Sequence, residues 1–104
     1  MTLQRLAANG SDLSHPHVIQ NVFHVYDQRN LAGLCEALEA ARFDLRDRGT
    51  PLVFQGTSYW NVEACRETVP ELESLNRMTD DCVALATEHE ADYDGWYTEV
   101  VSHA

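Results

Sequence analysis

The sequence predicts an α+β fold of the ferredoxin-like sandwich type, in which an antiparallel sheet carries two helices on one face. Two long segments, residues 31–41 and 70–89, repeat apolar side chains at the period of an α-helix. Shorter segments alternate apolar and polar residues, as half-buried strands do. After a short N-terminal helix the elements follow the order βαββαβ, which short, right-handed connections fold most simply as such a sandwich. No repeat or linker divides the 104 residues, so we expect one domain over residues 1–104.

The first half of the chain is expected to form a helix, a strand and a second helix. Leucines at helical spacing predict the first helix over Thr2–Ala8, and the Asn-Gly pair that follows ends it. β-branched and aromatic residues predict a strand over His17–Asp27. Asn30 is expected to cap the second helix. The strand should direct Ile19, Phe23 and Val25 to one face and Gln20, His24 and Tyr26 to the other.

The second half is expected to add the remaining strands and a long helix. Residues 43–46 predict a short strand, residues 47–51 a turn, and residues 52–54 an extra edge strand or a loop anchor. A longer strand is predicted over Ser58–Thr68, and Pro70 should stand in the first turn of the helix after it. Tyr93–Val101 is expected to be the final strand. The longer strand should point Trp60, Val62 and Ala64 one way and Tyr59, Asn61, Glu63, Cys65 and Glu67 the other.

The charge of the chain is strongly acidic and unevenly distributed. The formal net charge is −10, with 17 acidic residues, 7 arginines and no lysine, and residues 53–104 carry −9 of it. Such a surface repels phosphate backbones and anionic lipid. With no run of 18 apolar residues and no basic-then-apolar N-terminus, we expect neither a membrane span nor an export signal. A basic protein or a cationic ligand is therefore the favoured partner.

The three cysteines are expected to be small buried hydrophobes. Cys35, Cys65 and Cys82 are odd in number and lack CxxC spacing, which argues against both a disulfide framework and a zinc ribbon. Cys82 and His89 share a helical face, but their backbones should be about 10 Å apart. A reducing cytoplasm is the expected compartment.

Other candidates for chemistry are weak. His15 and His17 lack a third ligand at metal-site spacing, and the paired carboxylates Asp80-Asp81 and the acidic run over residues 88–94 are typical of a solvated rim. No nucleophile elbow, phosphate loop or dinucleotide turn occurs. We therefore expect no catalytic residue, no metal and no cofactor.

An open sheet face with aromatic residues also permits an RNA-binding interpretation. Tyr26 and Tyr59 are placed where RNA-recognition modules stack bases. The same face should carry Glu63, Glu67 and Glu99, and the nearby positive charge is limited to Arg42, Arg46 and Arg48. Direct nucleic-acid binding is thus disfavoured.

The most individual segment is Tyr93-Asp94-Gly95-Trp96. Because a helix closely precedes it, Gly95 is expected to mark a bulge or a close backbone approach rather than a hairpin turn. Trp96 should anchor the strand in the core and Tyr93 should close the junction with the helix. The exposed parts of this cluster form a candidate contact patch.

These residues resemble the regulator of ribonuclease activity B family, small bacterial proteins that inhibit ribonuclease E. The resemblance covers about residues 3–100 and rests above all on Tyr93-Asp94-Gly95-Trp96 with Thr98. It is supported by Gly10-Ser11-Asp12, the helix that begins at Asn30-Leu31, and Phe43-Asp44-Leu45. It implies the same ferredoxin-like fold and a non-catalytic, cytoplasmic inhibitor that binds the scaffold region of ribonuclease E.

The sequence therefore predicts a protein-binding regulator of RNA decay, a monomer or a weak homodimer, without direct binding to nucleic acid or membrane. Two alternatives stay open: an adaptor of the same fold with another protein partner, and a small ligand-binding or enzymatic domain that uses the open face around His24, Tyr26, Tyr59 and Glu63. Trp96 and Trp60 are expected to be structural. The expected protein-binding residues are Tyr93, Asp94, Gly95, Tyr97, Glu99 and Glu63.

Overall fold

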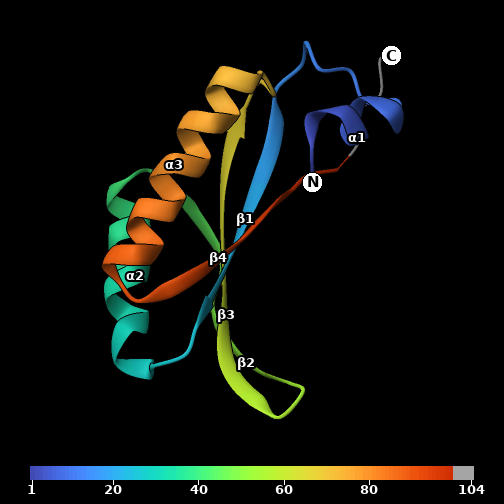
Figure 1. Cartoon of the computed structure of the whole chain (residues 1–104). Coiled ribbons are helices and arrows are strands. Elements are labelled where there is room, and N and C mark those ends of the chain that lie inside the picture. Colours follow the sequence, from blue (N-terminus) through green and yellow to red (C-terminus); the bar gives the residue numbers. More distant parts are fainter. Residues whose placement is uncertain (100–104) are drawn as a thin grey trace.

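The chain folds into one four-stranded antiparallel sheet that carries two long helices on the same face (Figure 1). The computed structural model describes residues 1–99. Its elements are α1 (Leu3–Ala8), β1 (His17–Val25), the 3-10 helix η1 (Gln28–Asn30), α2 (Leu31–Ala40), β2 (Asp44–Phe54), β3 (Thr57–Thr68), α3 (Leu72–Glu88) and β4 (Ala91–Tyr97). The strand order is β2-β3-β1-β4, with every neighbouring pair antiparallel. The predicted fold class is confirmed.

The second and third strands form one long hairpin, whose tip extends beyond α2 and α3 at one end of the molecule (Figure 1). β2 continues to Phe54, and the chain reverses at Gln55 and Gly56, where φ is +50° and +79°. Two central residues with positive φ match the twist of a tight hairpin. The prediction of a short strand over residues 43–46 is therefore wrong, and the expected extra strand at residues 52–54 is the end of this same strand.

The turn expected at residues 47–51 is instead an irregular, bulged part of β2. The register with β3 shifts before Asp47 and again before Thr50. The carboxylate of Asp47 accepts hydrogen bonds from the backbone N–H groups of Gly49 and Thr50, both at 3.0 Å. These local contacts resemble a turn, but on an edge strand they produce bulges without ending the pairing.

The hydrophobic core lies between the sheet and the helices α2 and α3. Phe23 at its centre is fully buried, and the sequence placed the inward side of β1 and β3 correctly. Cys35, Cys65 and Cys82 are free, buried thiols, as expected. The buried members of this cluster are Ile19, Phe23, Val25, Leu34, Cys35, Leu38, Phe43, Val62, Ala64, Leu75, Met78, Cys82 and Ala86.

One polar side chain, Asn21 on β1, is fully buried in this core. Its amide nitrogen donates to the carbonyl oxygen of Ala64 at 3.3 Å and lies 3.5 Å from the sulfur of Met78. Its amide oxygen accepts from the hydroxyl of Tyr93 at 2.7 Å. The amide of Asn21 therefore links β1, β3 and β4, and its hydrogen bonds compensate for the cost of removing it from water.

The end of β1 and the starts of α1 and α3 differ from the prediction by one or two residues, whereas α2 begins at Leu31 as expected. β1 ends at Val25, and the side chain of Asp27 caps η1 by accepting from the N–H of Arg29 at 3.0 Å. Hydrogen bonds from Arg29 lower the pKa of Asp27 to about 2. Asn30 occupies the N-cap position of α2, as predicted, but its side chain makes no cap hydrogen bond. Pro70 lies just before α3, whose first helical residue is Leu72.

The last strand begins and ends earlier than expected. β4 starts at Ala91, directly after a turn in which Glu90 has a φ of +53°, and it ends at Tyr97. Thr98 follows as a buried residue whose hydroxyl donates to the carbonyl oxygen of Val18 at 2.9 Å. Residues 100 and 101, which the prediction included in the strand, lie outside the described residues.

Candidate functional site

The two long helices leave the opposite face of the sheet open (Figure 1). Polar, acidic and aromatic side chains occupy it, because each strand directs alternate residues away from the helices. We call this surface the open face. It consists of Gln20 and His24 from β1, Tyr26 directly after β1, Tyr59, Asn61 and Glu63 from β3, Asp92, Asp94 and Tyr97 from β4, and Asp47 from β2.

Glu63 is the centre of a hydrogen-bond network on the open face. It accepts a short hydrogen bond from the hydroxyl of Tyr97. The amide of Asn61 donates to Glu63 at 3.1 Å and to Asp47 at 2.9 Å. The same Tyr97 hydroxyl lies 2.8 Å from the side-chain oxygen of Gln20. The hydrogen bond to Glu63, followed by partial burial and the negative charge of Glu63, raises the pKa of Tyr97 to about 12.

A bulge in β4 determines which side chains of the Tyr93–Tyr97 segment reach the open face. The pairing with β1 shifts between Asn21 and Phe23, and Gly95 has a φ of +100°. A Cβ on Gly95 would meet no heavy atom within 4 Å, so the positive φ, and not a close approach, calls for glycine there. The expected bulge is confirmed.

The bulge also separates the aromatic residues of this segment. One extra residue reverses the alternation, so Tyr93 and Trp96 both pack against the core while Tyr97 lies on the open face. Tyr93 lies with its ring 5.3 Å from that of Phe23 and donates to Asn21. Burial, and then the neighbouring Cys82, raise the pKa of Tyr93 well above its usual value.

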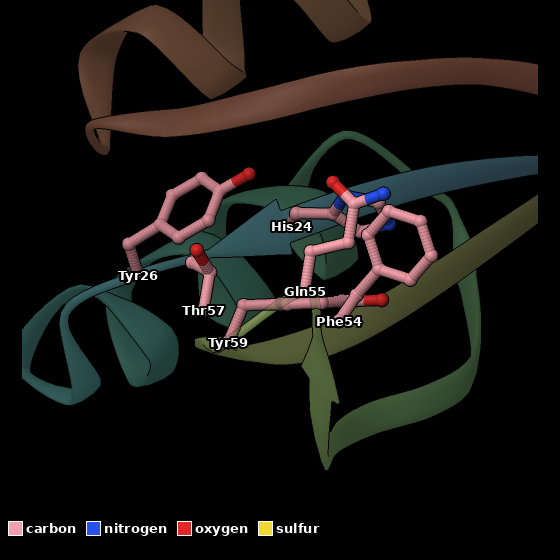
Figure 2. A pocket seen from close by; sticks show the side chains of 6 residues that line it. All are labelled: His24, Tyr26, Phe54, Gln55, Thr57 and Tyr59. Carbon is pink, nitrogen blue, oxygen red and sulfur yellow. The ribbon is translucent and has the colours of Figure 1, made fainter.

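An aromatic cluster occupies the end of the open face next to the hairpin tip. The ring centroids of His24 and Tyr59 are 4.5 Å apart, and those of Tyr26 and Tyr59 are 6.1 Å apart. These rings and the tip enclose a solvent-open hollow of about 240 Å³ (Figure 2). We call it the aromatic hollow; its lining residues are His24, Tyr26, Phe54, Gln55, Thr57 and Tyr59.

The carboxylates of the open face have little compensating positive charge. Within residues 1–99, none of the arginine ion pairs involves Glu63, Asp92 or Asp94. The Nε2 of His24 lies 3.9 Å from a carboxylate oxygen of Asp94. The guanidinium of Arg46 instead covers Cys65, with Nε 3.1 Å from the sulfur. The open face therefore presents a field that attracts cationic groups.

The residues expected to bind protein divide into two groups in the structure. Asp94, Tyr97 and Glu99 are exposed, and Glu63 is half-buried beside Tyr97. Tyr93 points toward the core, and Gly95 shapes the bulge. Trp60 and Trp96, expected to be structural, are partly buried against the core cluster.

Sequence reasoning missed two contributors to the open face, Asp92 and the exposed hairpin tip. Asp92 is paired with His24 in the strand register. The prediction missed this pair because it started the last strand at Tyr93, one residue after Asp92. Val53 and Phe54 are 72% and 65% exposed at the tip. An apolar pair directly before a Gln-Gly dipeptide, with a second strand after it, is the hairpin signal that would have located them.

The histidines and cysteines do not assemble a centre for metal or nucleophilic chemistry in the described part of the chain. Residues 1–99 contain no group of three or more potential metal ligands. Both ring nitrogens of the buried His17 are engaged, one with the carbonyl oxygen of His15 at 2.8 Å and the other with the hydroxyl of Ser11 at 2.6 Å. Burial raises the pKa of Cys82 to about 12, which disfavours its thiolate.

No helix in residues 1–99 is long and apolar enough to span a membrane. No curated protein matches the sequence. The model of one protein family, described as regulator of ribonuclease activity B, matches residues 1–98. That match includes every strand and helix of the fold, together with the bulged Tyr93-Asp94-Gly95-Trp96 segment on which the resemblance rests. The chain therefore belongs to the regulator of ribonuclease activity B family.

Proposed function

We propose that this protein is a non-catalytic, cytoplasmic regulator that binds the scaffold region of ribonuclease E and so changes RNA decay. Membership of the regulator of ribonuclease activity B family supports the regulatory role. The observation that carries the choice of a basic protein target is the open face, where Glu63, Asp92 and Asp94 have no arginine ion pair within residues 1–99. An acidic face of this kind attracts basic protein segments and repels RNA.

The proposed contact patch is the part of the open face around the β4 bulge, together with Glu99, which follows β4 in the chain. Asp94 and Glu99 supply exposed charge, while Tyr97 holds Glu63 through its hydroxyl. Preorganised side chains lose little freedom when a partner binds, which favours affinity. Tyr93 and Gly95 contribute by holding the strand in its bulged shape.

The direct test is charge reversal at the patch. The double variant Asp94→Arg/Glu99→Arg should weaken binding to purified ribonuclease E scaffold about tenfold or more at low salt, because it replaces attraction with repulsion. Binding is measured by titration calorimetry, and inhibition by cleavage of a ribonuclease E substrate. Far-UV circular dichroism and the melting temperature should change little, since both residues are exposed.

A matched control places the same charge change on the helices. Glu36 on α2 and Asp80 on α3 are exposed and form no arginine ion pair within residues 1–99, so Glu36→Arg/Asp80→Arg alters net charge equally. Equal loss of binding in both double variants would refute the patch and leave only a general charge effect. Absence of binding by the unmodified protein would refute ribonuclease E as the target, and affinity purification from the host cell would then identify another partner.

A further inference from the structure

The aromatic hollow combines exposed aromatic rings with carboxylates along one edge. Figure 2 shows the rings of Tyr26 and Phe54 on opposite sides of the hollow, with His24 between them. Tyr59 stacks in a tilted arrangement on His24 and lies next to Tyr26. Phe54 and Tyr26 are 65% and 46% exposed, although large apolar rings are usually covered. These rings thus offer aromatic faces to a partner.

Carboxylates stand directly beside these rings. Asp92 is the register partner of His24 on the neighbouring strand, and a carboxylate oxygen of Asp94 lies 3.9 Å from the Nε2 of His24. Partial burial, and after it the nearby carboxylate of Asp92, raise the pKa of Tyr26. The edge of the hollow toward β4 is therefore negatively charged.

We propose that the aromatic hollow binds the guanidinium group of an arginine side chain from a segment of the partner protein. A guanidinium is flat and weakly hydrated, so it stacks on aromatic rings while its N–H groups donate to carboxylates. A lysine ammonium is compact and strongly hydrated, and it exploits stacked rings less well. This inference rests on the proposed function, which makes the partner a basic protein, and it adds the residue type that the open face selects.

The charge pattern favours arginine over the other class of ligand that stacks on tyrosine. Nucleic-acid bases also stack on aromatic rings, but their phosphates need nearby cations. Here the neighbouring charged groups are Asp92 and Asp94, and the chain contains no lysine. An arginine-bearing peptide satisfies both the rings and the carboxylates.

The first experiment compares two peptides on the isotope-labelled chain of 104 residues. A tetra-arginine peptide and a tetra-lysine peptide of equal length and charge are titrated and followed by two-dimensional NMR. We expect the arginine peptide to bind at least about threefold more tightly and to shift the signals of Tyr26, Phe54 and Tyr59. Equal affinity for the two peptides, or shifts confined to other surfaces, would refute the inference.

Substitutions at the exposed rings provide the second experiment. Phe54→Ala and Tyr26→Ala should each lower the affinity for the arginine peptide by about threefold or more. Tyr26→Phe keeps the ring, so this variant should bind the peptide as tightly as the unmodified protein does. Leu72→Ala is the matched control, because Leu72 is an apolar side chain on α3 that is 67% exposed. Unchanged binding in both ring variants would refute stacking in the hollow.

The substitution Asp92→Asn tests whether the carboxylate of Asp92 contributes to binding, and Asp80→Asn is the control with the same change of charge. We expect Asp92→Asn to lower the affinity for the arginine peptide and Asp80→Asn to leave it unchanged. Tighter binding of a single-stranded oligonucleotide than of the arginine peptide would also overturn the inference. So would self-association in sedimentation experiments that the ring variants abolish, because a second copy of the chain would then occupy the hollow.

The same variants separate this inference from the proposed function. If ribonuclease E scaffold binds the unmodified protein and the ring variants equally, the hollow is not used and the proposed function stands. If the arginine peptide binds in the hollow but ribonuclease E does not bind, the hollow stands and the target is another arginine-bearing protein.

Discussion

The two faces of one sheet differ in how their side chains are held. On the covered face, Phe23 and its neighbours are buried by α2 and α3, and the buried amide of Asn21 has partners for both of its polar atoms. On the open face, side chains such as Glu63 and Tyr97 are held by hydrogen bonds alone, at the edge of water. Both faces are formed by the same strands, whose successive residues point to opposite sides of the sheet.

We infer from this difference that the covered face determines the stability of the fold and the open face determines binding. Burial of apolar area dominates the free energy of folding, so substitutions on the covered face should be costly. Solvent replaces lost hydrogen bonds on the open face, so substitutions there should change binding far more than folding. If the two effects do not separate in this way, the division between the faces fails.

The largest effect is expected from Phe23→Ala. The ring is fully buried at the centre of the core, so its removal leaves a cavity and should lower the free energy of unfolding by about 3–5 kcal/mol. Urea denaturation followed by tryptophan fluorescence measures this value. A loss below about 1 kcal/mol would show that the covered face does not hold the fold together.

Gly49→Ala should have the next largest effect, although the residue lies on an edge strand. Gly49 has a φ of +134°, and a Cβ there would lie 2.7 Å from Cδ2 of Leu31. Backbone strain and this overlap should together destabilise the protein by about 1–3 kcal/mol. Gly56→Ala is the control for backbone strain alone, because a Cβ at Gly56 meets nothing within 4 Å. Equal losses in the two variants would exclude contact with Leu31 as a cause.

A smaller effect distinguishes two tyrosine hydroxyls on opposite faces. Tyr93→Phe leaves the oxygen of the fully buried Asn21 without its donor and should cost about 1–3 kcal/mol. Tyr97→Phe removes a hydroxyl from Glu63 at the surface, where water substitutes, and should cost less than about 0.5 kcal/mol. Both variants are compared by urea denaturation, and a reversed order would contradict the assignment of the faces.

Hydrophobic periodicity was sufficient to predict the covered face. Phe23, Val62 and Leu75 lie in runs whose alternation or helical spacing survives small errors in element ends, so the fold class and most of the core followed from the sequence. The bulge at Gly95 was also predictable, because a helix so close before the Asp-Gly pair excluded a hairpin.

The open face was less predictable because it depends on register. Whether Asp92 stands beside His24, and whether Tyr93 points inward, is decided by one extra residue in β4. The turn signals around Gly49 and Pro51 were real, but tertiary pairing with β3 incorporated them into a strand. Periodicity cannot locate such shifts, since a one-residue slip exchanges the faces.

The smallest expected effect concerns acid stability, where the open face makes its own contribution to folding. Burial on its own would raise the pKa of Asp47, but hydrogen bonds from Asn61, Gly49 and Thr50 outweigh it and lower the pKa below its usual value. A carboxylate whose pKa is lowered by folding contributes stability that is present above the unfolded pKa and is lost as pH falls through the folded pKa. Asp47→Asn should therefore make the loss of stability below about pH 4 less steep, and Asp80→Asn on α3 is the control that removes the same charge from an exposed helix position. Thermal melts between pH 2 and about pH 7 measure both slopes, and parallel profiles for the unmodified protein and Asp47→Asn would show that this network organises the open face without stabilising the fold.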